Sequence, residues 1–321
     1  MVRHVSNTAL PYLPEPEPLQ CGRFTLSFER PLVMGILNVT PDSFSDGGKF
    51  EMRGDALRQA ERMMLDGADL IDIGGESTRP GAPPVPLDEE LERVIPLIEQ
   101  LHDAQVPLSV DTYKPEVMRH ALAAGADLIN DIWGFRRPGA IDAVRDSLCG
   151  LCVMHMLGEP QTMQVGEPAY EDVVSEVRAF LEQRVAALMQ AGIAKRRISV
   201  DPGFGFGKAV VEHNYALLAH LPETAPRGEP PFAAPVPILA GMSRKSMVGA
   251  VVGNVISFAS SPSSASPLST LKIADTSGIA AAISEPNMNS SSTSASDSPM
   301  ISELRSPVVC PISPAPAPYA T

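Results

Sequence analysis

The sequence has few cysteines and no long apolar run. Its four cysteines include one Cys-x-x-Cys pair, Cys149 and Cys152, with no second pair and no neighbouring histidine pattern. A zinc site is therefore not indicated, and Cys152, which falls in an apolar run, is expected to be a buried thiol. No run of about 18 apolar residues is present, and residues 1–20 lack the apolar core of a secretory signal. We expect a cytoplasmic protein that does not cross a membrane.

Positive charge is also scarce. The chain has 25 Lys and Arg against 38 Asp and Glu, a net charge of −13, and its mean hydropathy is +0.03. This balance is typical of a soluble globular protein and argues against a nucleic-acid-binding protein, which would usually present a basic face. It still permits an anionic substrate, because a local basic cluster can lie on an acidic body.

Short apolar runs alternate with amphipathic stretches from about residue 33 onward. The runs predict strands near 33–37, 69–73, 107–110, 127–129, 151–156, 197–200 and 236–240. The stretches between and after them predict helices near 54–66, 87–101, 115–124, 138–147, 170–191, 211–220 and 244–252. Apolar strands alternating with helices indicate a parallel sheet covered by helices. Seven such units favour a (β/α)8 TIM barrel over an open doubly wound sheet, which periodicity alone leaves open.

The two ends of the chain differ from this pattern. Residues 1–20 are rich in proline and are expected to be a disordered lead-in. Residues 21–254 form the predicted barrel domain. Residues 255–321 are rich in Ser, Ala and Pro and read as a disordered or aberrant tail, in which only 269–284 offers a short strand or helix.

Polar residues follow the predicted strands, where the active sites of parallel barrels lie. Asn38, Asp111, Asn130 and Asp201 each stand at a strand end, and Arg79, Arg244 and Lys245 lie in loops after strands. Carboxylates and amides suit a flat heterocycle with an amidine-like edge, and a helix opening at 243–246 favours an anion. The barrel mouth is therefore expected to bind a polar ring with an anionic end.

Each feature also has a structural interpretation. A single Asp at a strand end is often a helix cap, and a glycine-rich run such as 203–207 is usually a turn. His155 is more readily a buried, hydrogen-bonded histidine than a catalyst. The recurrence of polar residues at successive strand ends favours a ligand site.

Several ordered motifs resemble those of the dihydropteroate synthase family. The main ones are MGILNVTPDSFSDGG at 34–48 and IDIGGESTRPGA at 71–82. Shorter blocks follow in order: VDTYKPE at 110–116, INDI at 129–132, MHM at 154–156, DPGFGFGK at 201–208 and GMSRKSM at 241–247. Folate-dependent methyltransferases share the ring contacts but are not expected to carry both long loops.

The resemblance implies a (β/α)8 transferase, of the type EC 2.5.1.15, that joins 6-hydroxymethyl-7,8-dihydropterin diphosphate to 4-aminobenzoate. By the resemblance, four residues hold the pterin: Asp111, Asn130, Asp201 and Lys245. Met154 packs on the ring, and Asn38 touches Mg²⁺, the implied cofactor. The residues implied near 4-aminobenzoate or the diphosphate are Thr78, Arg79, Phe206, Ser243 and Ser246. Asp46, Arg79 and Lys245 carry the implied catalytic roles, with Asp46 stabilising a cationic intermediate.

The resemblance ends near residue 254. The family's eighth strand ends in an Arg-x-His motif for the diphosphate, and this chain has no histidine beyond His220. We therefore expect the eighth β/α unit to be missing or aberrant, which would leave an open seam in the barrel. The alternative function is a catalytically impaired relative that binds pterin. The family also implies a homodimer and small-molecule substrates only.

Overall fold

The computed structural model describes residues 16–40, 49–77, 82–158, 168–209, 211–227, 234–242 and 279–283. A short antiparallel hairpin comes first, with strands β1 (Leu19–Cys21) and β2 (Phe24–Leu26). The parallel strands that follow are β3 (Leu32–Asn38), β4 (Leu70–Gly74), β5 (Leu108–Asp111), β6 (Leu128–Asp131), β7 (Gly150–Met154), β8 (Ile198–Asp201), β9 (Ile238–Gly241) and β10 (Ile279–Ile283). The helices are α1 (Lys49–Leu65), α2 (Leu87–Gln100), α3 (Pro115–Ala124), α4 (Ala140–Val144), α5 (Val173–Gln190) and α6 (Glu212–Ala219), with 3-10 turns at Lys195–Arg197 and Leu221–Glu223.

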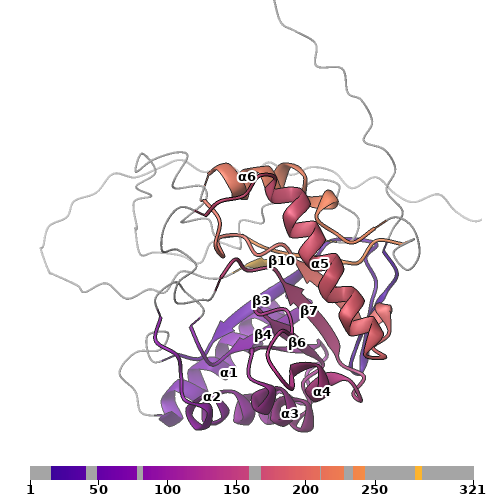
Figure 1. Ribbon diagram of the computed structural model, residues 1–321. Helices are drawn as coiled ribbons and strands as arrows, with labels where there is room; N and C mark the ends of the chain where they lie inside the picture. Colours follow the sequence, from indigo (N-terminus) through magenta and orange to yellow (C-terminus); the bar gives the residue numbers. More distant parts are fainter. Residues whose placement is uncertain are drawn as a thin grey trace, which may run out of the picture. The chain divides into compact units, whose positions relative to one another are not determined.

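The parallel strands close into a barrel in the order β10-β3-β4-β5-β6-β7-β8-β9, with helices outside them (Figure 1). All seven strands predicted from the sequence are present, as are the first six helices; the predicted helix at 244–252 lies outside the described residues. The barrel is confirmed over the open sheet.

The predicted gap at the eighth strand is filled. β10 pairs in parallel with β9 and with β3, so it closes the seam between the last and first strands. It falls within 269–284, the one part of the C-terminal segment for which the sequence offers a strand or helix. Of the two alternatives predicted for the eighth unit, a missing strand is therefore wrong, whereas an aberrant unit stays a prediction, because no Arg-x-His motif follows β10. A strand can form in a weakly patterned sequence when two neighbouring strands supply its hydrogen bonds. The helix that would follow lies outside the described residues.

The two faces of the strands have different partners. Outward side chains such as Ile71, Val110 and Ile129 pack against the helices in the main apolar core. Inward side chains near the strand starts, including Met34, Leu70 and Leu128, form a second apolar cluster with Leu19, Cys21 and Phe28. The β1–β2 hairpin thus covers the amino end of the barrel, and the opposite end is left for polar residues.

The hairpin is fixed by specific bonds. The Arg23 guanidinium donates to Oδ1 and Oδ2 of the buried Asp127 at 3.0 and 2.9 Å, and Gly22 N donates to Leu148 O at 3.1 Å. Asp127 precedes β6 and Leu148 precedes β7, so both anchors lie where strands enter the barrel. These contacts hold the β1–β2 hairpin against the amino end of the barrel and so support the side chains packed inside it.

Candidate active site

Strand register brings three of the predicted polar residues, Asn38, Asp111 and Asn130, onto one level of the barrel. Asn38 lies opposite Gly74, Gly74 opposite Asp111, and Asp111 opposite Asn130. A side chain at Gly74 would begin 3.5 Å from Asn38 Oδ1 and 3.8 Å from Asp111 Oδ2. These two oxygens therefore face the same space at the barrel mouth.

A second polar level lies one step deeper and is centred on Asp72. The Asp72 carboxylate accepts the Ser109 hydroxyl at Oδ1, at 2.5 Å, and the Asn130 amide nitrogen at Oδ2, at 3.2 Å. Asp72 and Asn130 belong to β4 and β6, which are not adjacent, so this bond crosses the inside of the barrel. Asp72 is only 3% exposed.

Two buried acceptors in this pocket have no partner. Asp111 Oδ1 and Asn130 Oδ1 are inaccessible to solvent and accept no hydrogen bond from the residues that the structure describes. Buried polar atoms are almost always hydrogen-bonded, and one left without a partner costs about 1–3 kcal/mol. A ligand that offers N–H groups to both oxygens would remove this cost.

The pocket is strongly acidic in its interior. Burial raises the pKa of Asp111 well above its usual range, and the negative charges of Asp72, Glu90, Asp131 and Glu76 raise it further. Burial likewise raises the pKa of Asp201 to about 7, although the Gly203 N–H and the Lys208 charge oppose this rise. Such a site favours a ligand that donates protons or gains positive charge.

Apolar and aromatic side chains form the wall beside these acids. Tyr113, Ile132, Met154 and Met156 are buried in one cluster, and Trp133 and Phe206 pack against it. The Tyr113 and Trp133 rings lie with centroids 6.0 Å apart, and the Arg137 guanidinium lies over both, 4.6 and 5.2 Å from the centroids. This wall offers flat surfaces suited to an aromatic ligand.

The loop after β8 is clamped by Lys208. Its ammonium, on a side chain only 1% exposed, donates to Gly203 O at 2.8 Å and Phe206 O at 3.1 Å, and it lies 2.9 Å from His155 Nδ1. Gly203 adopts φ +68°, and an added Cβ would lie 1.9 Å from His155 O. The glycine-rich run is therefore more than a flexible turn, because it allows the loop backbone to pass directly over the end of β7.

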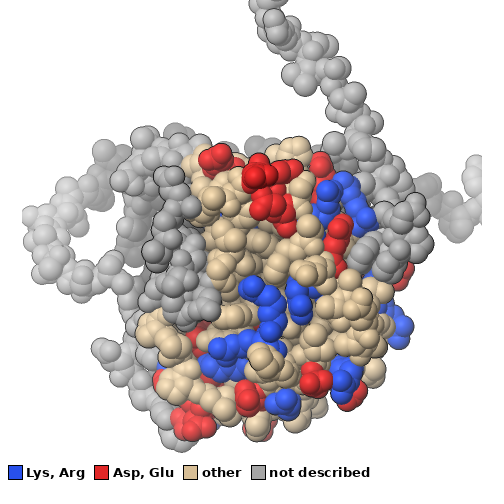
Figure 2. All heavy atoms as spheres, viewed as in Figure 1, with Lys and Arg blue, Asp and Glu red and all other residues tan. Residues whose placement is uncertain are grey.

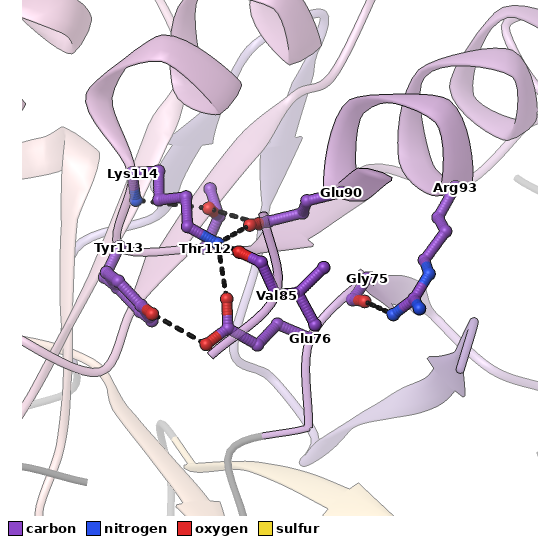
Figure 3. A network of polar contacts seen from close by, with 8 residues as sticks. All are labelled: Gly75, Glu76, Val85, Glu90, Arg93, Thr112, Tyr113 and Lys114. Atoms are coloured by element: carbon purple, nitrogen blue, oxygen red, sulfur yellow. Dashed lines mark hydrogen bonds and ion pairs between the residues drawn. The ribbon is translucent and has the colours of Figure 1, made fainter. Parts of the chain in front are cut away.

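A buried ionic network supports the segment after β4 (Figure 3). Lys114 Nζ donates to the carboxylates of Glu76 and Glu90 and to Val85 O. Tyr113 OH donates to Glu76 Oε1 at 2.6 Å, and Thr112 Oγ1 donates to Glu90 Oε1 at 2.7 Å. The network ties the loop after β4 to the residues that follow Asp111, and so fixes the Tyr113 wall relative to the acidic pocket.

The surface carries a local positive region on an acidic protein. On the face that Figure 2 shows, Lys and Arg side chains gather near the middle, while many Asp and Glu side chains lie nearer the edges. A negative net charge is therefore compatible with local attraction of an anion. No helix among the described residues is long and apolar enough to cross a membrane.

The chain is similar to a family of pterin-binding enzymes and to several dihydropteroate synthases. The model of the family "Pterin binding enzyme" matches residues 34–283. The chain is 72% identical to the Burkholderia cenocepacia dihydropteroate synthase solved with 7,8-dihydropteroate, with a TM-score of 0.68 over 74% of this chain and 81% of that one. It is 51% identical to the Xanthomonas albilineans enzyme solved with 4-aminobenzoic acid, with a TM-score of 0.65 over 74% and 82% of the two chains. It is 50% identical to dihydropteroate synthase of Escherichia coli K12 over 70% of this chain and 77% of the relative.

The chain belongs to the dihydropteroate synthase family of pterin-binding enzymes.

The structure brings together the described members of the predicted dihydropteroate synthase site. Asn38, Asp111, Asn130, Met154 and Asp201 all lie at the carboxyl ends of barrel strands. Phe206 packs against the cluster that contains Met154. The other predicted members lie outside the described residues: Asp46, Thr78, Arg79, Ser243, Lys245 and Ser246.

The predictions for His155 and Cys152 are confirmed. His155 is buried and lies against Lys208, and burial lowers its pKa to about 2, so it stays neutral. Cys152 is buried in the barrel interior, where burial raises its pKa well above the usual value for a thiol.

Sequence reasoning missed three parts of this family site: Asp72, Lys208 and the Glu76–Lys114 pair. Asp72 carried a signal, because it is a charged residue in the middle of the apolar strand LIDIG. A strand buried on both faces admits a carboxylate only where the interior supplies donors. Lys208 and Lys114 lacked such a signal, since lysines in loops are usually solvated.

Proposed function

We propose that this chain condenses 6-hydroxymethyl-7,8-dihydropterin diphosphate with 4-aminobenzoate, giving 7,8-dihydropteroate and pyrophosphate. The observation that carries the proposal is a pair of buried acceptors inside an acidic pocket, Asp111 Oδ1 and Asn130 Oδ1, which have no partner among the described parts of the chain. The aminopyrimidine edge of a pterin offers adjacent N–H donors, which are the groups that these oxygens lack.

The pocket also suits the chemistry of the reaction. The bond between the pterin methylene and the diphosphate oxygen breaks with its electron pair leaving on the diphosphate, and the positive charge spreads into the ring. A ring that gains positive charge in a buried site favours the ionised forms of Asp111 and Asp201, whose pKa values burial raises, and the resulting carboxylates stabilise the charge. The aminobenzoate nitrogen then forms the new C–N bond with its lone pair and loses a proton. An arylamine is already nucleophilic, so no strong base is required.

The aromatic wall provides a place for the second substrate. Phe206 and Met154 lie in one cluster beside the acidic pocket. We place the pterin ring against Met154 and the aminobenzoate ring toward Phe206. Thr78, Arg79, Ser243 and Ser246 are proposed to complete this side of the site, with Lys245 on the pterin and Asp46 near the cationic intermediate; these assignments rest on the family motifs.

Asn38 is the proposed protein ligand of Mg²⁺. Its side chain is exposed at the end of β3, and its Oδ1 faces the space over Gly74. An amide oxygen suits Mg²⁺, which keeps several waters and often binds few protein groups together with substrate phosphates. When bound, the ion would neutralise charge on the departing diphosphate.

The closed barrel favours an active enzyme over the alternative, a pterin-binding relative without catalysis. β10 completes the wall between β9 and β3, and β3 ends in Asn38. β10 pairs with the first residues of β3, Leu32 to Gly35, so the wall is closed at the start of the strand that carries Asn38. The cytoplasmic location, the homodimer and the absence of nucleic-acid partners stay predictions from the sequence.

The test measures pyrophosphate release by the purified full chain with both substrates and Mg²⁺. We expect turnover, and we expect Asp111→Asn to lower kcat/KM about 10–100-fold, because the amide can turn a donor toward the N–H edge and leave it unpaired. Asp69→Asn is the matched control, since Asp69 pairs with Arg30 at the surface, outside the pocket. Pterin binding without turnover would establish the impaired relative instead.

A further inference from the structure

Asp72 is a buried acidic residue of the pocket that makes no direct contact with the substrates in the proposed reaction. Both of its oxygens are occupied, Oδ1 by the Ser109 hydroxyl and Oδ2 by the Asn130 amide nitrogen. It lies on the level below Asn38, Gly74 and Asp111, because its register partners are Ile36 and Ser109. The carboxylate therefore acts on the ligand pocket through Asn130.

The contact with Asp72 decides how the Asn130 amide is turned. An amide has a donating NH₂ end and an accepting oxygen end, and the NH₂ end donates to Asp72 Oδ2. Burial raises the pKa of Asp72, but the hydrogen bonds from Ser109 and Asn130 oppose this rise because they favour the ionised carboxylate, which only accepts. Because the NH₂ group faces Asp72, the oxygen faces away from it, where it is buried and has no partner within the described ranges. The opposite orientation would set the amide oxygen against the Asp72 carboxylate, placing two acceptors together.

The orientation determines which ligand edge fits. Asn130 is the register partner of Asp111, so with its oxygen turned away from Asp72 the two residues present acceptors from neighbouring strands. A ring edge with two N–H donors satisfies the acceptors of both Asn130 and Asp111. A ring edge with a nitrogen acceptor opposite Asn130 would leave that nitrogen and the Asn130 oxygen without a hydrogen bond. A freely turning amide would accept either edge and would discriminate less.

We propose that Asp72 is a positioning residue that holds the Asn130 amide with its oxygen toward the ligand, and so restricts the pocket to a heterocycle edge rich in N–H donors. The inference rests on the proposed function, in which that edge belongs to a dihydropterin. Ser109 holds the other carboxylate oxygen and keeps the carboxylate from turning away from Asn130.

A reciprocal exchange separates this role from simple packing. Asp72→Asn lets the Asn130 amide turn, and we expect pterin affinity to fall about 10–100-fold. Asn130→Asp sets two carboxylates together and should also weaken binding. The double variant Asp72→Asn with Asn130→Asp restores a donor facing an acceptor, with the amide now on β4, and leaves a carboxylate oxygen toward the ligand. Its affinity should recover to within about threefold of the wild type.

The measurement is the dissociation constant of 7,8-dihydropterin, followed by its fluorescence, together with KM for 4-aminobenzoate. We expect the single variants to change pterin affinity with little change in KM for 4-aminobenzoate. Ser109→Ala, which keeps the contact with Asn130, should weaken binding less than Asp72→Asn. A double variant no better than the weaker single variant, or a single Asp72→Asn variant with wild-type affinity, would overturn the proposal.

Neutron diffraction from deuterated wild-type crystals keeps the proposal testable if the variants do not fold. Deuterium distinguishes the amide nitrogen of Asn130 from its oxygen directly. Nitrogen facing Asp72 is the expected result, and oxygen facing Asp72 refutes the inference. Wild-type protein that binds pterin but releases no pyrophosphate would contradict the proposed reaction while leaving this result standing.

Discussion

Replacing Lys208 with methionine is expected to change how stability depends on pH. The Lys208 ammonium is almost fully buried, and burial lowers its pKa from an ordinary 10.5 to about 7, although the charge of Asp201 opposes the shift. The unfolded chain therefore holds this proton more tightly than the folded protein does. Folding is penalised while the lysine must stay charged, and the penalty is removed as the pH rises from about 7 toward 10.5.

The expected size follows from this difference in proton affinity. A tenfold change in proton affinity corresponds to 1.36 kcal/mol, so the full effect is on the order of 5 kcal/mol. Between pH 7 and pH 9 the wild type should gain about 2 kcal/mol relative to Lys208→Met. Asp201 works in the same direction, because removing the Lys208 charge lets its pKa rise further and penalises the variant as the pH increases.

The change in the stability difference between the wild type and Lys208→Met from pH 7 to pH 9 is more informative than that stability difference at either pH alone. At one pH, methionine removes a buried charge but also leaves His155 Nδ1, Gly203 O and Phe206 O without their donor. These effects oppose each other, since an unpaired buried acceptor costs about 1–3 kcal/mol. The change with pH isolates the titration of Lys208.

Urea unfolding at pH 7 and pH 9 measures the effect, with the fluorescence of Trp133, the one tryptophan of the chain, as the probe. Lys195→Met is the matched control, because Lys195 is half-buried and donates to Ala234 O away from the pocket. The control should keep the same gap from wild type at both pH values. A Lys208→Met gap that stays constant within about 0.5 kcal/mol, or that narrows at pH 9, would show that Lys208 is not the buried titrating group described above.

Three further predictions concern the loop, the network and the metal. Gly203→Ala should destabilise the fold by at least about 2 kcal/mol, because the strain of a positive φ adds to a clash with His155 O. Gly192→Ala, at φ +92° with open space around it, should cost only about 1 kcal/mol. Thermal unfolding compares the two variants, and equal losses of stability would contradict the close approach of Gly203 to His155. Glu76→Gln should lower the free energy of unfolding by about 1–3 kcal/mol, because it weakens the buried ionic contact with Lys114. Glu89→Gln, which loses a more exposed ion pair with Arg93, should lower it by less than about 1 kcal/mol. Similar losses for the two variants in a denaturant titration would contradict a stabilising role for the buried network. Removing Mg²⁺ with EDTA should abolish most pyrophosphate release yet leave binding of 7,8-dihydropterin unchanged. An Asn38→Ala variant should need a higher Mg²⁺ concentration for half-maximal activity. If binding of the pterin without its diphosphate required the metal, the proposal that Mg²⁺ acts only on the diphosphate would be contradicted.

The alternation of strands and helices could be predicted because it follows from which faces are buried. Residues such as Ile71, Ile73 and Val110 face the helices, and the runs that contain them are apolar enough to be recognised without a structure. The ligand-facing ends of β5, β6 and β8 could be predicted for the same reason. Asp111, Asn130 and Asp201 each interrupt an apolar run at the point where a parallel strand ends.

The closure of the barrel could not be predicted in this way. The segment that contains β10 is short and weakly patterned, and its place as a strand depends on hydrogen bonds from β9 and β3. Those partners lie about 40 and 250 residues away along the chain. Local composition does not report contacts at such separations.

The sequence by itself determined seven of the barrel strands, the acidic and amide residues at their ends and the family motifs, because each is encoded in local pattern. Only the tertiary structure decided that the Asn130 amide donates to Asp72, that Lys208 holds the loop beside His155, and that Glu76 and Glu90 share Lys114. The physical reason is that these are contacts between side chains from different strands and loops. Their energy depends on burial and mutual orientation, which exist only once the barrel has closed.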